Sequence, residues 1–158
     1  MKVNRFDLSD YLIHFTRSSG KGAFENLKSI IATGKLNPAW ALRNGKRGIF
    51  GNHPAVCFTN MPLFSFYQYV KNRHDDSKVD FYGIALDKEK MFRLGARNVI
   101  YGTTNFPEDN GEPDAEGRRM TSYLPEKEQY RYILTNIDDK NDWTHEGEWR
   151  WTNQFGKS

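Results

Sequence analysis

Cysteine and long apolar runs are the features that this 158-residue chain has least of. Its single cysteine, Cys57, excludes an internal disulfide framework, and its place in the apolar run Ala-Val-Cys-Phe favours a buried thiol over a nucleophile. No apolar stretch approaches the ~18 residues that a membrane helix needs, and no cationic segment followed by an apolar one opens the chain. We therefore expect a soluble, cytoplasmic protein with no membrane partner.

The signatures of several nucleotide-binding and metal-binding folds are also missing. The chain contains neither G-x-x-x-x-G-K-[ST] nor G-x-G-x-x-G, which excludes a P-loop and a Rossmann fingerprint. It lacks H-E-x-x-H and any cysteine pair, so a zinc site would need scattered histidines, and we expect no metal. The absence of G-x-S-x-G removes the nucleophile elbow of serine hydrolases.

What remains has the composition of an ordinary globular domain that is rich in aromatic rings. Charged residues make up 27% of the chain, hydrophobic residues 37% and aromatic residues 15%. The rings favour a packed core over a cleft that stacks planar ligands. The net charge of +3 is compatible with an anionic dinucleotide or a nucleic acid, without choosing between them. At this length we expect one domain over residues 1–158.

Short strands and short helices intermix along the chain. Apolar side chains at helical spacing predict a helix over 23–33, which Gly34 ends, and an aromatic helix is expected over 63–72. We expect strands at 11–16, 55–59, 81–86, 98–101 and from Glu148 onward. Because regular helices of ~10–15 residues between strands are missing, the pattern predicts an α+β domain rather than a doubly wound one.

Two long connections separate these elements. The segment 35–54 is rich in glycine and contains four cations, and a loop of this length in a compact domain is usually functional or mobile. The segment 102–117 is dense in glycine, proline, asparagine and acidic residues, so we expect a flexible loop there.

The polar residues that could carry chemistry are a histidine near one end of the chain and a Glu-Gly-Glu turn near the other. His14 lies in an apolar strand, where a histidine is more often a hydrogen-bonded core residue than a ligand. Glu146 and Glu148 stand beside Arg150 and by themselves fit an edge-strand ladder of salt bridges. These residues therefore indicate a site only when they are taken together.

Three blocks of the chain, in order, resemble the ADP-ribosyltransferase superfamily, in particular its DarT-like and abortive-infection-type bacterial branches. The first is Leu-Ile-His14-Phe-Thr16 followed by a helix of the form Asn-Leu-x-x-Ile-Ile-x-x-Gly-x-Leu. The second runs from Val56 through Cys-Phe-Thr to the aromatic helix, and the third is Glu146-Gly-Glu148-Trp-Arg. The resemblance implies a split β-sheet core with short flanking helices, and NAD as a substrate.

The resemblance also implies a role for each site residue. Glu148 and Glu146 would be catalytic, because cleavage of the nicotinamide–ribose bond passes through a cation-like ribose that a carboxylate stabilises. His14 would hold the ribose, and the backbone around Phe15, with Thr16, would bind the carboxamide side of NAD. Stacking on nicotinamide and contacts with the pyrophosphate would come from Tyr67, with Phe58 or Tyr69 as substitutes, and from Arg43 and Arg47.

The partners expected on this basis are NAD and a macromolecule that accepts ADP-ribose, in a toxin or phage-defence protein with an antitoxin as a further partner. Nucleic acid is favoured over protein, because Trp40 and Tyr67 are available for base stacking. Two alternatives stay open. One is a non-catalytic module that binds nucleic acid or a protein partner on the same fold. The other is a metal-dependent nuclease that uses Asp75, Asp76, Glu146 and Glu148.

Overall fold

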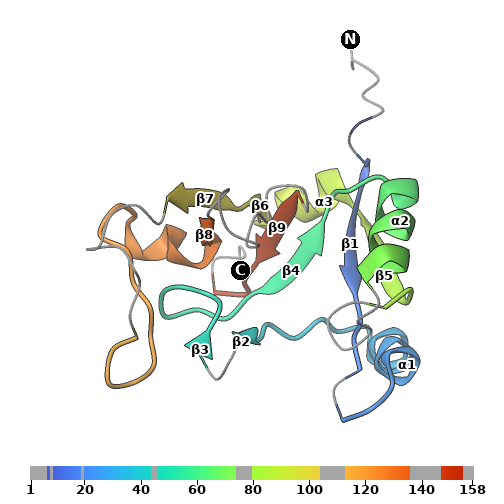
Figure 1. Ribbon diagram of the computed structural model, residues 1–158, viewed down its shortest axis with the longest axis horizontal. Coiled ribbons are helices and arrows are strands. Elements are labelled where there is room, and N and C mark those ends of the chain that lie inside the picture. Colours follow the sequence, from blue (N-terminus) through green and yellow to red (C-terminus); the bar gives the residue numbers. More distant parts are fainter. Residues whose placement is uncertain are drawn as a thin grey trace.

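The protein is built around one antiparallel sheet of five strands, with short helices beside it and two small two-stranded sheets (Figure 1). This computed structural model describes residues 7, 9–18, 20–43, 46–73, 80–103, 113–135 and 147–154. The order of the main sheet is β5 (Gly83–Asp87), β1 (Tyr11–Phe15), β4 (Val56–Thr59), β9 (Glu148–Trp151) and β6 (Arg97–Asn98). The predicted α+β class is confirmed.

The helices begin and end close to where the sequence places them. They are α1 (Ala23–Thr33), α2 (Leu63–Arg73), α3 (Lys88–Arg93) and the 3₁₀ helix η2 (Glu126–Arg131). Gly34 ends α1 in the left-handed conformation, with φ 64°, and its N–H donates to the Ile30 carbonyl oxygen at 2.8 Å. No helix in the described part of the chain is long and apolar enough to cross a membrane.

One of the two smaller sheets lies in a segment in which the sequence favours a loop. Within the basic connection, β2 (Leu42–Arg43) and β3 (Lys46–Arg47) form a short hairpin. The strand predicted at 98–101 is divided between β6 and β7 (Ile100–Thr103), and β7 pairs in parallel with β8 (Tyr132–Thr135). The predicted loop at 102–117 therefore starts as a strand. Residues 104–112 lie outside the described part, and Asp114 to Arg118 form a hydrogen-bonded turn.

Strand pairing in the main sheet is extensive between β1 and β5 and between β4 and β9, but not between β1 and β4. β1 pairs with β5 from Tyr11↔Asp87 to Phe15↔Gly83, and β4 pairs with β9 at every residue of both strands. Between β1 and β4 the register contains the single pair Ile13↔Thr59. In Figure 1, β1 accordingly runs at a steep angle to β4 and β9. The sheet is therefore splayed between β1 and β4.

The core is divided among three clusters of buried side chains. On one face of the sheet the first cluster packs residues of β1, β4 and β9 against the α3 segment: Leu12, Val56, Phe58, Met91, Ala96 and Trp149. On the other face the second cluster joins Ile49, Ala55 and Tyr130, with Trp40 and Cys57 against them. The third fixes α2 through Phe66 and Val70.

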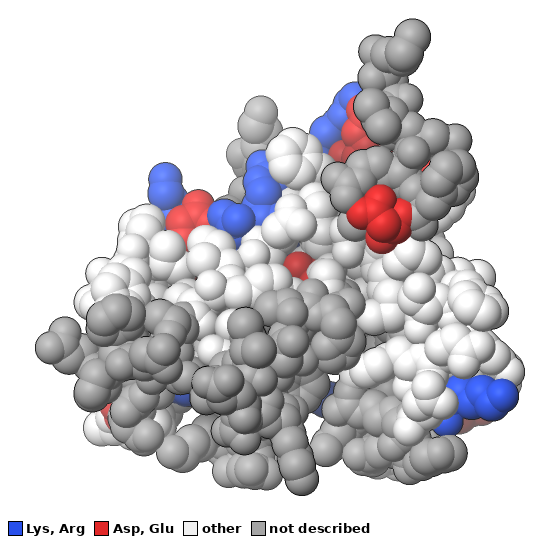
Figure 2. Space-filling view, turned by 45° about the horizontal axis from the view of Figure 1, so that its top comes forward, with Lys and Arg blue, Asp and Glu red and all other residues white. Residues whose placement is uncertain are grey.

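Charge is concentrated at the margins of the surface shown in Figure 2. Lysine, arginine and acidic side chains lie along its upper and lower edges, whereas uncharged side chains fill much of the area between them. An acidic group is recessed among these uncharged side chains near the middle of the view. This distribution agrees with the small net charge of the chain.

Candidate active site

His14 lies where the sheet opens, and its imidazole reaches across to the neighbouring strand. Its Nδ1 is 2.9 Å from the carbonyl oxygen of Cys57 in β4. A carbonyl oxygen only accepts hydrogen bonds, so Nδ1 must carry the proton and donate it. The ring also meets Phe58 edge-on, with centroids 5.9 Å apart. The side chain of His14 therefore connects β1 and β4 beyond the point where their backbones are paired.

The environment of His14 favours its neutral form. Burial lowers the pKa of the imidazole below its ordinary value of 6.5, and the positive charge of Arg17 lowers it further. The hydrogen bond to Cys57 acts in the opposite direction without cancelling the effect of burial. With the proton of the neutral ring on Nδ1, Nε2 presents a lone pair. His14 can thus accept a hydrogen bond from a ligand hydroxyl.

Glu148 begins β9 as one half of a buried ion pair. Only 8% of the residue is exposed, and Oε1 accepts a hydrogen bond of 2.7 Å from Nε of Arg150, which is 4% exposed. Nη1 of Arg150 donates to the carbonyl oxygens of Tyr130 and Tyr132. Burial disfavours the charged guanidinium, but the Glu148 carboxylate and the nearby Cys57 thiol outweigh this and raise the pKa of Arg150. Glu148 thus faces a permanent positive charge.

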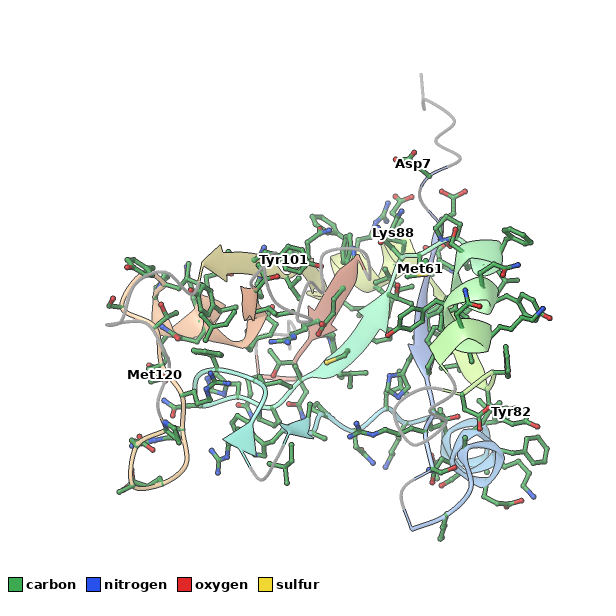
Figure 3. All side chains as sticks on the ribbon, in the orientation of Figure 1. Asp7, Met61, Tyr82, Lys88, Tyr101 and Met120 are labelled. Carbon is green, nitrogen blue, oxygen red and sulfur yellow. The ribbon has the colours of Figure 1, made fainter. Side chains whose placement is uncertain are left out.

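The backbone around Glu148 is held from several directions. Gly147, immediately before it, has φ +51°, and its carbonyl oxygen accepts from the N–H of Asn60 at 3.2 Å. The N–H of Glu148 donates to the Tyr101 hydroxyl at 3.3 Å, and its carbonyl oxygen accepts from Val99 at 3.1 Å. Tyr101 belongs to β7 and lies near the start of β9 in Figure 3. Contacts from two segments, Asn60 after β4 and Val99 with Tyr101 in the β6–β7 segment, therefore fix the backbone that carries the carboxylate.

Strand pairing decides which of these side chains share a face of the sheet. Directly opposed residues on antiparallel strands point to one face, and successive residues of a strand point to opposite faces. Thr59 is opposed to both Ile13 and Glu148, so these three side chains share a face. His14 follows Ile13 and lies with Phe58 on the other face. His14 is therefore the neighbour in sequence of Ile13, which shares a face with Glu148, but the side chains of His14 and Glu148 point to opposite faces of the sheet.

The predicted NAD contacts at the end of β1 take part in packing. The ring of Phe15 is stacked on Phe66 of α2, with centroids 3.4 Å apart and planes 7° apart. Thr16 is buried, and its hydroxyl oxygen lies 2.8 Å from the Ala23 carbonyl oxygen and 3.1 Å from that of Tyr82. These two side chains join β1 to α1, to α2 and to the start of β5.

The candidate stacking rings lie in two different environments. Phe58 is 3% exposed and belongs to the first core cluster, so its ring faces neighbouring side chains. Tyr67 is 47% exposed on the outer side of α2, where its nearest aromatic partner is Phe81 at 5.7 Å. Tyr69, the other substitute, packs against the third core cluster. Of these candidates Phe58 meets His14 edge-on, whereas Tyr67 and Tyr69 lie on α2.

Arg47 lies on the same side of the sheet as Glu148. Its guanidinium is stacked over the ring of Trp40, 4.2 Å from the ring centroid. Trp40 packs against the second core cluster together with Cys57, which is opposed to Arg150 in the sheet. Arg43 pairs through its backbone with Lys46, and its side chain is not among those described. Glu146, Asp75 and Asp76 lie outside the described residues.

Sequence reasoning missed the residues that hold this site together. Arg150 was considered as a member of an exposed ladder, whereas it is the buried partner of Glu148 on a central strand. The signal was present, because residues i and i+2 of a strand share a face and the flanking tryptophans indicate burial. Tyr101 and Arg119 gave no such signal, since their contacts come from segments remote in the sequence.

Comparisons with known protein families, with curated proteins and with solved structures find no match to this chain. Among the residues that the structure describes, no group of three or more histidine, cysteine, aspartate or glutamate side chains is placed to hold a metal ion.

Proposed function

We propose that this protein is an NAD-dependent mono-ADP-ribosyltransferase with a split-sheet fold, which cleaves NAD and transfers ADP-ribose to a macromolecule. The observation that carries the proposal is the placement of two groups on the two strands that flank β4, one on each face of the sheet. The Glu148 carboxylate begins β9, and His14, whose Nε2 can accept a hydrogen bond, lies on β1.

Glu148 has the properties that the bond cleavage requires of a carboxylate. Loss of nicotinamide leaves positive charge on the ribose, and a fixed negative charge nearby stabilises that transition state. Arg150 donates a hydrogen bond to Oε1, which leaves Oε2 for a ribose hydroxyl. The contacts at Gly147, Tyr101 and Val99 hold the carboxylate in place before the substrate arrives.

His14 would act on the ribose as a hydrogen-bond acceptor. Its Nδ1 is committed to Cys57, so Nε2 is the atom that would receive a hydroxyl proton. Because adjacent strands lie ~4.8 Å apart, β1 and β9 are separated by about 10 Å across β4. The proposal places the nicotinamide ribose at the junction of β1 and β4, where the register contains the single pair Ile13↔Thr59.

The acceptor in this proposal is nucleic acid, with protein second. The exposed ring of Tyr67 offers a planar surface for bases, and the chain carries a net charge of +3. The sequence resemblance extends the proposal to a toxin or phage-defence role, in which an antitoxin would control the activity.

The test is the release of nicotinamide from labelled NAD in the presence of single-stranded DNA, RNA or a protein extract. We expect release and transfer of label with the wild-type protein, unchanged by a chelator, and a loss of at least ~100-fold with Glu148→Gln. Glu116→Gln, which removes an exposed carboxylate paired with Arg118, is the matched control and leaves activity unchanged.

A folding defect must be separated from a catalytic one, because Glu148→Gln also removes the partner of Arg150. The double variant Glu148→Gln with Arg150→Gln replaces the buried pair by two neutral amides. If this protein has a native circular dichroism spectrum and no activity, the carboxylate itself is required. The proposal is wrong if wild-type protein releases no nicotinamide with any acceptor, or if Glu148→Gln retains wild-type turnover.

A further inference from the structure

β5 forms one edge of the main sheet, and no strand in the described part of the chain pairs with its outer side. A hydrogen bond shows which backbone groups face that side. The N–H of Thr16 donates to the Tyr82 carbonyl oxygen at 2.9 Å, so Tyr82 faces β1. Alternate residues of an antiparallel strand present their N–H and C=O groups to opposite sides. Gly83, Ala85 and the N–H of Asp87 therefore face outward.

The outer side of β5 is open to another strand. Proline and lysine, which block sheet edges in many proteins, do not occur in this strand of sequence Gly-Ile-Ala-Leu-Asp. Ala85, at its centre, is exposed. The backbone is capped just before the strand, where the N–H of Phe81 donates to Oδ1 of Asp80 at 2.7 Å. The unpaired edge is thus confined to β5 itself.

Exposed aromatic rings flank the start of β5 on both faces of the sheet. Tyr82 meets Phe24 of α1 with ring centroids 5.2 Å apart, beside α1 in Figure 3, and Phe81 meets Tyr67 of α2 at 5.7 Å. The four rings are between 42% and 54% exposed. The two helices contact successive residues at the end of β1, so they lie on opposite faces. A strand added to β5 would therefore meet apolar surface on each side.

We propose that β5 pairs with β5 of a second copy of this chain, antiparallel and about a two-fold axis at Ala85, so that the sheet continues through a dimer. Gly83 of one copy then lies opposite Asp87 of the other, and Ala85 lies opposite Ala85, so the outward-facing backbone groups meet. Ile84 lies opposite Leu86 of the other copy. Both side chains are half-buried, and the symmetry forms this apolar pair twice.

The charges beyond the two ends of β5 fit this pairing. Asp80 precedes the strand and Lys90 follows it, each five positions from Ala85, so the two-fold axis relates one to the other. Neither forms an ion pair with a described residue, whereas Glu89, next to Lys90, is paired with Arg93. The dimer would bring the carboxylate of each copy towards the ammonium group of the other. A second copy therefore supplies the backbone groups, the apolar side chains and the opposite charge together.

Light scattering behind size-exclusion chromatography, over a range of protein concentrations, tests the pairing. We expect the wild-type protein to form dimers. Ala85→Pro removes an outward N–H that has no partner within the chain and places a ring where the second strand would lie, so it should be monomeric. Ala85→Val keeps the N–H and is the matched control, which should form dimers. Native circular dichroism spectra show that both variants are folded.

A charge exchange tests the same register without altering the backbone of β5. Lys90→Glu places like charges together twice in each dimer and should weaken the dimer by about tenfold or more. Adding Asp80→Lys restores opposite charges and should recover most of the affinity.

The proposal is overturned if the wild-type protein is monomeric at every concentration up to about 200 µM. A dimer that persists in Ala85→Pro would place the contact on another surface, and a double variant no tighter than Lys90→Glu would exclude the register. The pairing does not depend on the proposed reaction, so a dimer without nicotinamide release would support the one and contradict the other.

Discussion

At the scale of single residues, the buried pair of Glu148 and Arg150 links stability to the proposed chemistry. Removing one partner of a buried ion pair leaves an uncompensated charge, which costs ~3–5 kcal/mol. We therefore expect Arg150→Met to lower the free energy of unfolding in urea by about that amount at neutral pH. Because the double variant Glu148→Leu with Arg150→Met removes both charges, it recovers most of the stability.

The exposed Arg118 provides the comparison for this prediction. It is paired with Asp114 and Glu116 at similar distances but in contact with solvent, so Arg118→Met changes the free energy of unfolding little. Equal effects of Arg150→Met and Arg118→Met would show that the interior pair is not the one that stabilises the fold.

The lowered pKa of His14 makes a second prediction at this scale, on the dependence of stability on pH. In the unfolded chain the imidazole has its ordinary pKa of 6.5, and burial lowers the value in the folded protein. Between these two pH values the unfolded state binds more protons than the folded state. The contribution of His14 to stability is therefore complete above pH 6.5 and is lost as the pH falls through the pKa of the folded protein. Urea unfolding at a series of pH values from about 7.5 to about 5 measures this loss.

His14→Gln separates the contribution of His14 from that of the other titrating groups. The glutamine amide is polar and neutral and takes up no proton in this pH range. The difference in unfolding free energy between wild type and His14→Gln should therefore shift in favour of the variant as the pH falls below 6.5. A difference that stays constant over the whole range would contradict the neutral, buried state of His14.

Residue types together with the family resemblance identified His14 and Glu148 as candidates, but not the atoms that they contact. The partner of His14 is a backbone carbonyl 43 positions away, and it is accessible only because β1 and β4 diverge. Likewise, the sequence places Glu148 and Arg150 on one face of a strand, yet the depth of their burial depends on η2 and β8 above them. Long-range packing therefore decides what each candidate can do.

At the scale of elements, the turn into β9 depends on a glycine that no other residue replaces easily. Gly147 has φ +51°, and a Cβ added there would lie 2.2 Å from Oδ1 of Asn60. Gly147→Ala should therefore destabilise the protein by more than the ~1–3 kcal/mol of backbone strain alone, and should displace Glu148. Urea unfolding and nicotinamide release, measured on the same protein, check both effects.

Gly117→Ala is the control for the strain component of this prediction. Gly117 also has a positive φ of +73°, but nothing lies within 4 Å of the added Cβ. Gly147→Ala with Asn60→Ala removes the contact with the asparagine and should approach the stability loss of Gly117→Ala. If Gly147→Ala alone is no more destabilising than Gly117→Ala, the close packing against Asn60 does not matter for the turn.

The sequence predicts elements best where a local signal marks their ends. The bounds of α1 follow from Gly34, and α2 follows from the turn Asn60-Met-Pro, whereas the hairpin of β2 and β3 has no alternating apolar pattern to reveal it. The break between β6 and β7 was also missed, because the two short strands join different sheets. The opening between β1 and β4 is a matter of register, which depends on strands far apart in the chain.

At the scale of the whole molecule, β4 is the element that two of the three core clusters share. Its Val56 and Phe58 belong to the first cluster on one face, and its Cys57 packs against the second on the other. α2, which carries the third cluster, follows β4 directly in the chain. The composition predicts a core of adequate size for one domain. It gives no indication that the four-residue strand β4 connects the first cluster to the second.

This arrangement predicts that the molecule unfolds as one unit. Phe58→Ala removes a buried ring from the first cluster and should cost ~3–5 kcal/mol. Trp40 reports on the second cluster, and its fluorescence is obtained as the difference between wild type and Trp40→Phe. If β4 couples the clusters, Phe58→Ala lowers the urea midpoint of the Trp40 signal as much as that of the far-ultraviolet circular dichroism.

Phe64→Ala removes the same ring from a position that is 74% exposed on α2, so it should change either midpoint little, by at most ~0.5 kcal/mol. A Trp40 transition that keeps its wild-type midpoint in Phe58→Ala while the circular dichroism transition shifts would divide the molecule into two units that unfold separately. In that case Arg47, stacked on Trp40 beside the second cluster, would keep its position after β1 and His14 had unfolded. Coincident transitions instead mean that both parts of the proposed NAD site are lost together, because they share the strand that carries Cys57 and Phe58.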